Sequence, residues 1–277
     1  MITRTLGSLA RIVLWIACAS GSLVSSVRAA PQEPAGAAFD QTHARWGEVL
    51  KACVRDGAFD YAKLKQDRSA LDAYLTSVHA VTPKLLEGWS ESQRFAFWLN
   101  CYNAHCVQKV LDNYPLKSIR KLDGAFGMNT VFDKPFIPMR AHNPLGKDED
   151  LSLSDIEHRI LRAHFKDARM HAALCSASKG CAPLLGEPFV GERLEAQLER
   201  EMHVFVADAL RNHIDTAKST LAVAETFKWF AEDFEREAKT VKEYLARYAP
   251  ADKTDFIRAS KLEYLAFDWN LNDVAQK

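Results

Sequence analysis

The chain has 277 residues, of which 48% are hydrophobic, and its 36 basic side chains balance its 36 acidic ones. This composition is ample for one large domain with a sizeable core, and it lacks the basic surplus of a nucleic-acid binder. We therefore expect no nucleic-acid partner. No internal repeat or long low-complexity tract appears.

The N-terminal residues have the pattern of a secretory signal. Arg4 and Arg11 form a positive region, and the short apolar run IVLWIACASGSLV leads to an A-x-A-like cleavage site at Val27–Ala29. We predict a signal peptide over residues 1–29. The alternative, a lipoprotein signal ending at Cys18, fits the preceding residues badly.

The rest of the chain reads as one exported domain. Residues 30–41 are rich in Pro, Gly and Ala and are predicted to be a linker, which leaves a domain over 42–277. No later apolar run approaches the ~20 residues of a membrane helix. We expect a periplasmic or secreted protein with no transmembrane segment after signal removal.

The elements that periodicity predicts are mostly helices. In chain order, the predicted helices lie in HARWGEVLKACV, in DYAKLKQDRSALDAYLTSV after a turn, in residues 92–114, and in LSLSDIEHRILRAHF, GERLEAQLEREMHVFVADAL, ETFKWFAEDF and TVKEYLARYA. The predicted strands are ARMHAALC, STLAVA and part of SKLEYLAFDWNLND, the last pairing with an earlier strand. Long helices and a few strands without a βαβ rhythm indicate an α+β fold, mainly helical with a small sheet, in a single domain.

The strongest helical signal runs from Ser92 to Tyr114, with Ser90 or Ser92 as the N-cap and Pro115 just beyond the end. Apolar side chains fall on one stripe at 3.6 residues per turn. Asn103 lies at the edge of that stripe. Because a buried amide needs hydrogen-bond partners, Asn103 is more informative than its apolar neighbours.

The helix predicted in LSLSDIEHRILRAHF places a carboxylate against an apolar surface. Glu157 points into the middle of the apolar arc and His158 lies at its edge. A carboxylate in that position must be paired, protonated or functional. The structural alternative is that Glu157 only caps the helix from its N3 position.

The segment HAALCSASKGCAPL combines a histidine with two cysteines six residues apart. If ARMHAALC is a strand, alternation places His171 and Cys175 on the same face, and SASKG forms the turn before Cys181. Signal removal leaves Cys53, Cys101, Cys106, Cys175 and Cys181. Five is an odd number, so at least one thiol stays unpaired within the monomer.

Four motifs in the same order resemble the family known as domain of unknown function 547. RFAFWLNCYNAHCVQKVLDNYP resembles its "AFWINxYNA" helix, SDIEHRIL its "IEH" helix, HAALCSASKGCAPL its "HFALxCASxxCPPL" segment, and LEYLAFDWNLN its "YDWxLN" ending. The resemblance runs from about Phe39 to the C-terminus. The characteristic residues that it transfers to this chain are Trp98, Asn100, Tyr102, Asn103, Glu157, His158, His171, Cys181, Asp268 and Trp269.

The chain departs from that pattern at one position. Bacterial members often have a cysteine after "HFALx", where this chain has Ser176 and its cysteine one residue earlier, Cys175. A shift of one residue in a strand turns a side chain to the opposite face. Either the segment bulges, or this cysteine is not an obligatory nucleophile of the family.

One hypothesis is a thiol-dependent hydrolase or acyl transferase acting on a cell-envelope substrate. Cys175 would be the nucleophile and His158 or His171 the base. Asn103 or Glu157 would orient that base, and backbone N–H groups of the turn after Cys175 would stabilise an oxyanion.

The alternative is a non-enzymatic periplasmic module that binds a ligand or protein partner and carries a structural Cys175–Cys181 disulfide. A metal site built from Glu157, His158, His171 and a cysteine has no HExxH or paired CxxC spacing to support it. We therefore predict no cofactor and no metal.

Overall fold

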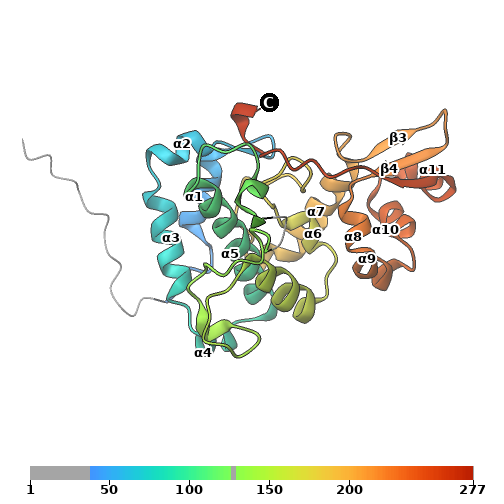
Figure 1. Ribbon diagram of the computed structural model, residues 1–277. Helices are drawn as coiled ribbons and strands as arrows, with labels where there is room; N and C mark the ends of the chain where they lie inside the picture. The colour runs from blue at the N-terminus through green and yellow to red at the C-terminus, as the bar shows by residue number, and fades with distance from the viewer. Residues whose placement is uncertain (1–37, 126–128, 277) are drawn as a thin grey trace, which may run out of the picture. The chain divides into compact units, whose positions relative to one another are not determined.

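The computed structural model describes residues 38–125 and 129–276, and the chain from Ala38 onward forms one compact unit. The predicted signal peptide and the linker up to residue 37 lie outside the described residues. The unit is mainly helical with two small sheets, which confirms the α+β prediction (Figure 1).

The α-helices of the described residues are α1 (Ala44–Cys53), α2 (Tyr61–Gln66), α3 (Ser69–His79), α4 (Pro83–Glu87), α5 (Glu91–Leu111), α6 (Met170–Ala173), α7 (Leu194–Ala207), α8 (Thr226–Trp229), α9 (Ala231–Ala238), α10 (Val241–Tyr248) and α11 (Thr254–Ala259). The other helices are the 3₁₀-helices η1 (Ile119–Leu122), η3 (Arg140–His142), η5 (Gly191–Arg193), η6 (Ala251–Lys253) and η7 (Val274–Gln276), and the π-helix η4 (Asp155–Phe165). Within the described ranges, no helix has the length and apolarity that a bilayer crossing requires.

The strands are β1 (Val54–Arg55), β2 (Ala58–Phe59), β3 (His213–Asp215), β4 (Thr220–Val223) and β5 (Lys261–Tyr264). β4 lies between an antiparallel β3 and a parallel β5, so STLAVA is a strand as predicted and the C-terminal strand does pair with an earlier one. β1 and β2 form a separate hairpin.

Helix α5 is the centre of the larger hydrophobic core. Ser90 Oγ accepts from the Gln93 N–H and Gln93 Oε1 accepts from the Ser90 N–H, which is the capping box that starts the helix. The helix ends at Leu111, before Pro115. Every residue from Phe95 to Val107 is buried, so the single apolar stripe that we predicted was too narrow. The reason is tertiary, because α2, α3, α7 and η4 all contact this helix.

A second hydrophobic cluster joins α7, α9 and α10 to strand β4. In Figure 1, helices α8 to α11 and strands β3 and β4 gather at one end of the described unit, away from α1 to α3. His171 and Arg162, on segments next to the larger core, contact the α8–α9 region through Asp233 and Phe230. The segments around Glu157 and His171 therefore lie where the two clusters meet.

The predicted strand ARMHAALC is wrong. Residues 170–173 form the short helix α6, because the N–H groups of residues 170–172 donate to carbonyls three residues earlier and Leu174 donates to Met170 O. The Asp167 carboxylate accepts a hydrogen bond from the Arg169 N–H at the start of this helical turn, and the two alanines favour a helix. The backbone becomes extended at Leu174, after the helix ends. Alternation along a strand therefore does not set the faces of His171 and Cys175.

Candidate functional site

The cysteine loop, residues 175–181, is attached on one side to helix α5. Asn103 is buried, and its Nδ2 donates to Ala173 O at 2.8 Å while its Oδ1 accepts from the Cys175 N–H at 2.9 Å. The side-chain amide of Asn103 thus acts as the hydrogen-bond partner of the backbone groups on both sides of Leu174. Asn103 therefore holds the cysteine loop in position and does not orient an imidazole.

The other side of the cysteine loop is paired with the closing segment, residues 265–273. The Lys179 N–H donates to Asn270 O, the Gly180 N–H donates to Asp268 O, and the Asn272 N–H donates to Ala177 O. Two of the turn N–H groups that we expected to stabilise an oxyanion are therefore already occupied. A Cβ at position 180 would lie 2.8 Å from Asp268 N, so this close approach requires glycine.

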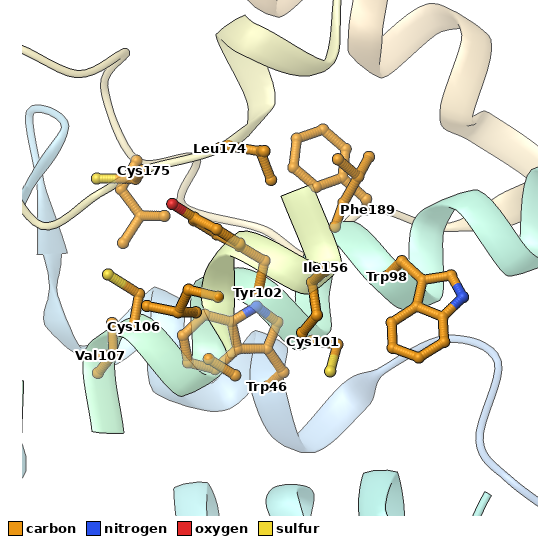
Figure 2. Close-up of a cluster of buried hydrophobic side chains, with 14 of the residues drawn as sticks. Trp46, Trp98, Cys101, Tyr102, Cys106, Val107, Ile156, Leu174, Cys175 and Phe189 are labelled. Carbon is orange, nitrogen blue, oxygen red and sulfur yellow. The ribbon is translucent and has the colours of Figure 1, made fainter. Parts of the chain in front are cut away.

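The two cysteine sulfurs lie side by side. Cys175 Sγ and Cys181 Sγ are 2.9 Å apart, and both residues are free thiols. Asn272 Nδ2 donates to Cys175 Sγ at 3.2 Å, and Cys181 Sγ donates to Ser178 O at 2.9 Å. Figure 2 shows Cys175 in the hydrophobic cluster around α5, alongside Tyr102 and Cys106.

The two thiols differ in acidity. The hydrogen bond with Cys181 and burial together raise the pKa of Cys175 well above its usual value. Burial alone would also raise the pKa of Cys181. Hydrogen bonds with Cys175 and with the backbone at Ser178, together with the charge of Arg211, outweigh burial and lower this pKa to about 7. Of the pair, Cys181 is the thiol that ionises near neutral pH.

A cavity of about 260 Å³ opens beside Cys181. Its lining is Tyr102, Thr130, Phe132, Asp133, Ser154, Glu157, His158, His171, Leu174, Ser176, Cys181, Ala182, Thr226, Trp229, Phe230, Phe267 and Trp269. Four predicted or family-derived chemical groups thus share one cavity, namely Glu157, His158, His171 and Cys181. Cys175 and Asn103 lie behind its wall and do not line it.

His171 is held by a carboxylate that we did not predict. Its Nε2 lies 2.8 Å from Asp233 Oδ2, and its ring stacks on Phe230 with centroids 4.0 Å apart. Burial lowers the pKa of His171 although Asp233 opposes this, so the ring is neutral near pH 7. With Nε2–H donating to Asp233, the lone pair is on Nδ1, for which no hydrogen-bond partner exists among the described residues.

Asp233 is also the anchor of two arginines. Arg162 Nε and Nη2 donate to its two oxygens at 2.6 and 3.1 Å, and Arg236 Nη2 donates to Oδ1 at 2.6 Å. Burial acts to raise the pKa of Asp233, but the hydrogen bonds from His171 and Arg162 hold it well below its usual range. The carboxylate therefore stays ionised and fixes the tautomer of His171.

Glu157 faces the cavity in a largely apolar setting, as its place on the apolar arc predicts. Tyr102 Oη donates to its Oε2 at 3.4 Å. Burial raises the pKa of Glu157 to about 7, against the opposing hydrogen bond of Tyr102 and charge of Arg162. Glu157 does not cap its helix, since the Ser154 N–H donates to Phe132 O instead. It can therefore exchange a proton near neutral pH.

His158 lies at the more open part of the cavity. Arg162 Nη1 is 3.4 Å from its Nδ1, and its ring faces Phe230 at 6.1 Å. Partial burial and the nearby charge of Arg162 lower the pKa of His158. Neither His158 nor His171 hydrogen-bonds to a cysteine in the described part of the chain. No group of three or more potential metal ligands is found there either.

Aromatic rings form one wall of the cavity. Phe267 packs against Trp269 at 4.4 Å and against Trp229 at 4.9 Å, and the Arg120 guanidinium covers Trp269 at 4.7 Å. Trp229 is 44% exposed, which is unusual for so large an apolar side chain. Sequence reasoning missed Trp229, Phe230 and Asp233 because their helices show only ordinary amphipathic spacing.

Comparison with known proteins gives one finding. Residues 86–206 match the family described as "Protein of unknown function, DUF547". The chain therefore contains a DUF547 segment over these residues. No curated protein matches it, and no solved structure does.

The DUF547 match covers only part of the site. It contains α5, η4, α6 and the cysteine loop, and hence Asn103, Glu157, His171 and Cys181. Asp233 and the aromatic wall lie C-terminal to the matched residues. The DUF547 segment supplies the thiol, the imidazoles and most of the cavity lining, while Asp233, which orients His171, and the part of the wall formed by Trp229, Phe267 and Trp269 come from outside it.

Proposed function

We propose that this DUF547 chain is a thiol-dependent hydrolase or acyl transferase, acting on a cell-envelope substrate, with Cys181 as its nucleophile. The observation that carries the proposal is that Cys181, His171 and Glu157 line the same cavity. The nucleophile role moves from Cys175 to Cys181 because Cys175 lies behind the cavity wall and its pKa is raised.

The acid–base roles follow from the contacts of His171. Its Nδ1 takes the proton of the Cys181 thiol, and Asp233 stabilises the imidazolium that results. The thiolate sulfur attacks the carbonyl carbon of the substrate and forms a C–S bond, and the leaving group departs with the proton of His171. Water or an acceptor amine or alcohol, deprotonated by His171, then releases the acyl group and regenerates the thiol.

The oxyanion formed in each step needs a donor that is not already paired. Ser176 lines the cavity, and its hydroxyl is buried without a hydrogen-bond partner among the described residues. A buried hydroxyl without a partner costs free energy that a substrate oxygen recovers. Glu157, with a pKa of about 7, supplies a second proton donor at neutral pH.

The second candidate is a binding module without catalysis, in which Cys175 and Cys181 form a structural disulfide. The 2.9 Å separation of the sulfurs favours it, as does the lack of a hydrogen bond from either site imidazole to Cys181 within the described residues. Of the described cysteines, only Cys181 lines the cavity, and a disulfide there removes its thiol.

A burst experiment separates the two. The reduced protein is mixed with p-nitrophenyl acetate, and we expect one p-nitrophenol released per chain with an acetyl group on Cys181. Cys181→Ala should abolish the burst and His171→Ala should slow it, while Cys53→Ala, a buried thiol in α1, should leave it unchanged. A burst that persists in Cys181→Ala refutes the thiol mechanism, and a reduced wild-type protein without any burst favours the binding module.

A further inference from the structure

We propose that Cys181 is a site of modification by hydroperoxides and that Cys175 is the thiol that resolves it. Among the five described cysteines, only these two bring their sulfurs within hydrogen-bonding distance, at 2.9 Å. The assignment of the modification itself needs no catalytic activity. Its consequence for activity rests on the proposed function.

The two thiols are almost equally buried, but only one of them lines the cavity. Cys175 is 5% and Cys181 6% exposed, yet only Cys181 lines the 260 Å³ cavity. An oxidant that enters the cavity meets the Cys181 sulfur first, while Cys175 is enclosed by the larger hydrophobic core. Cys181 also has the lower pKa, and the thiolate is the form that reacts with peroxides.

The backbone holds the sulfurs together from both sides. Asn103 fixes the Cys175 N–H, and Arg211 Nε donates to Cys181 O at 2.6 Å. Asn272 is fixed by Tyr61, whose hydroxyl donates to its Oδ1 at 2.8 Å, and it in turn donates to Cys175 Sγ. A disulfide bond has an S–S length of ~2.05 Å, so the two sulfurs need to approach by only ~0.9 Å. The hydrogen bonds above already hold both ends of the loop in place.

The reaction has two steps. The Cys181 thiolate attacks the terminal oxygen of a hydroperoxide, which breaks the O–O bond, gives Cys181 sulfenic acid and releases hydroxide or alkoxide, protonated to water or an alcohol. The Cys175 sulfur then attacks the sulfenic sulfur, which forms the S–S bond and releases water. The peroxide is reduced by two electrons, and both electrons come from the two thiols. A small-molecule thiol or dithiol reverses the change by exchange.

Such a disulfide would protect the nucleophile. Sulfinic and sulfonic acids form when a sulfenic acid persists, and they are not recovered by thiols. A resolving sulfur 2.9 Å away captures the sulfenic acid before further oxidation. Acyl chemistry at Cys181 would stop in the disulfide form and return on reduction.

The test treats reduced full-length protein with a small excess of hydrogen peroxide at pH 7. Wild type should lose the mass of two hydrogens, and peptide mapping should locate the bond between Cys175 and Cys181. Cys175→Ser should accumulate a sulfenic acid at Cys181 that reacts once with dimedone. Cys181→Ser should give neither product, and Cys53→Ala should behave as wild type.

The proposal is overturned if wild type forms no Cys175–Cys181 bond, or if dimedone labels wild-type Cys181 as fully as it labels Cys175→Ser. Peptide mapping of wild type decides this even if a variant fails to fold. Loss of the p-nitrophenyl acetate burst on oxidation and its return on reduction would support regulation of the active site. A disulfide in a protein that shows no burst when reduced refutes the proposed function and leaves the modification site standing.

Discussion

The acidity of Cys181 gives the sharpest prediction. A thiol with the ordinary pKa of 9.0 is ~1% ionised at pH 7, whereas the pKa of about 7 makes Cys181 ~50% ionised. The ~50-fold gain in thiolate is offset by lower intrinsic nucleophilicity, since a Brønsted slope of ~0.45 over two pKa units costs ~8-fold. Cys181 should therefore be alkylated ~6-fold faster at pH 7 than an ordinary thiol in the same cavity.

The assay follows iodoacetamide labelling of reduced protein between pH 5 and 10 by peptide mass spectrometry. The rate at Cys181 should reach half of its maximum near pH 7. Cys175→Ala removes a hydrogen bond that stabilises the Cys181 thiolate, so the midpoint should move up towards 9.0 and the rate at pH 7 should fall by up to ~6-fold. A wild-type midpoint near 9, or faster labelling of Cys175, would refute the assignment of the acidic thiol.

Three further predictions concern stability. Asp233→Asn leaves a buried histidine and two arginines without their carboxylate, and urea unfolding should show a loss of about 3 kcal/mol at pH 7. Because the folded pKa of Asp233 is depressed below 3.8, its contribution is present above that pH and is lost as the pH falls further, so wild type should approach the variant in acid. Asn103→Ala breaks two buried hydrogen bonds at the start of the cysteine loop and should cost about 2–4 kcal/mol. Asn113→Ala, at an exposed position just beyond the end of the same helix, should cost under about 1 kcal/mol, and equal losses would contradict the anchoring role. Gly180→Ala places a Cβ 2.8 Å from the closing segment and should lower the melting temperature by several degrees, while Gly186→Ala, with its nearest neighbour at 3.9 Å, should not.

The site explains why the motif residues of this family have different roles. Asn103 and Cys175 lie behind the cavity wall. They hold that wall in position, because their hydrogen bonds are with the cysteine loop and the closing segment. Glu157, His171 and Cys181 face the cavity and can exchange protons. Motif membership alone does not distinguish a residue that supports the wall from one that faces the cavity.

The lining of the cavity bears on the kind of ligand that fits it. Among the described residues, the cavity lining contains two carboxylates, Asp133 and Glu157, but no lysine or arginine. Burial lowers the pKa of both histidines, so neither adds a positive charge at neutral pH. Anionic groups are therefore disfavoured in the cavity. A neutral or cationic group with an apolar face suits Trp229 and its neighbours better.

Local sequence determined the elements whose signals are local. The capping box of Ser90 and Gln93 and the proline at position 115 bound α5 whatever surrounds the helix, and its boundaries were predicted to within three residues. The strand at Thr220–Val223 alternates buried and partly buried side chains, as its sequence predicts. The mainly helical α+β class follows from many such local signals, because each depends on neighbours within one or two turns.

The cavity was decided by tertiary contacts. Residues 170–173 are helical although their sequence alternates like a strand, and Asn103, 70 positions away, binds the carbonyl oxygen of Ala173 at the end of this helix. Asp233 reaches His171 across 62 positions of the chain, a separation at which no spacing rule applies. Sequence could show that Cys175 and Cys181 stand six residues apart. Which sulfur faces the cavity depends on the hydrogen bonds that Asn103, Asn272 and Arg211 make with the loop. These three residues are distant from the loop in sequence, and only the folded chain brings them next to it.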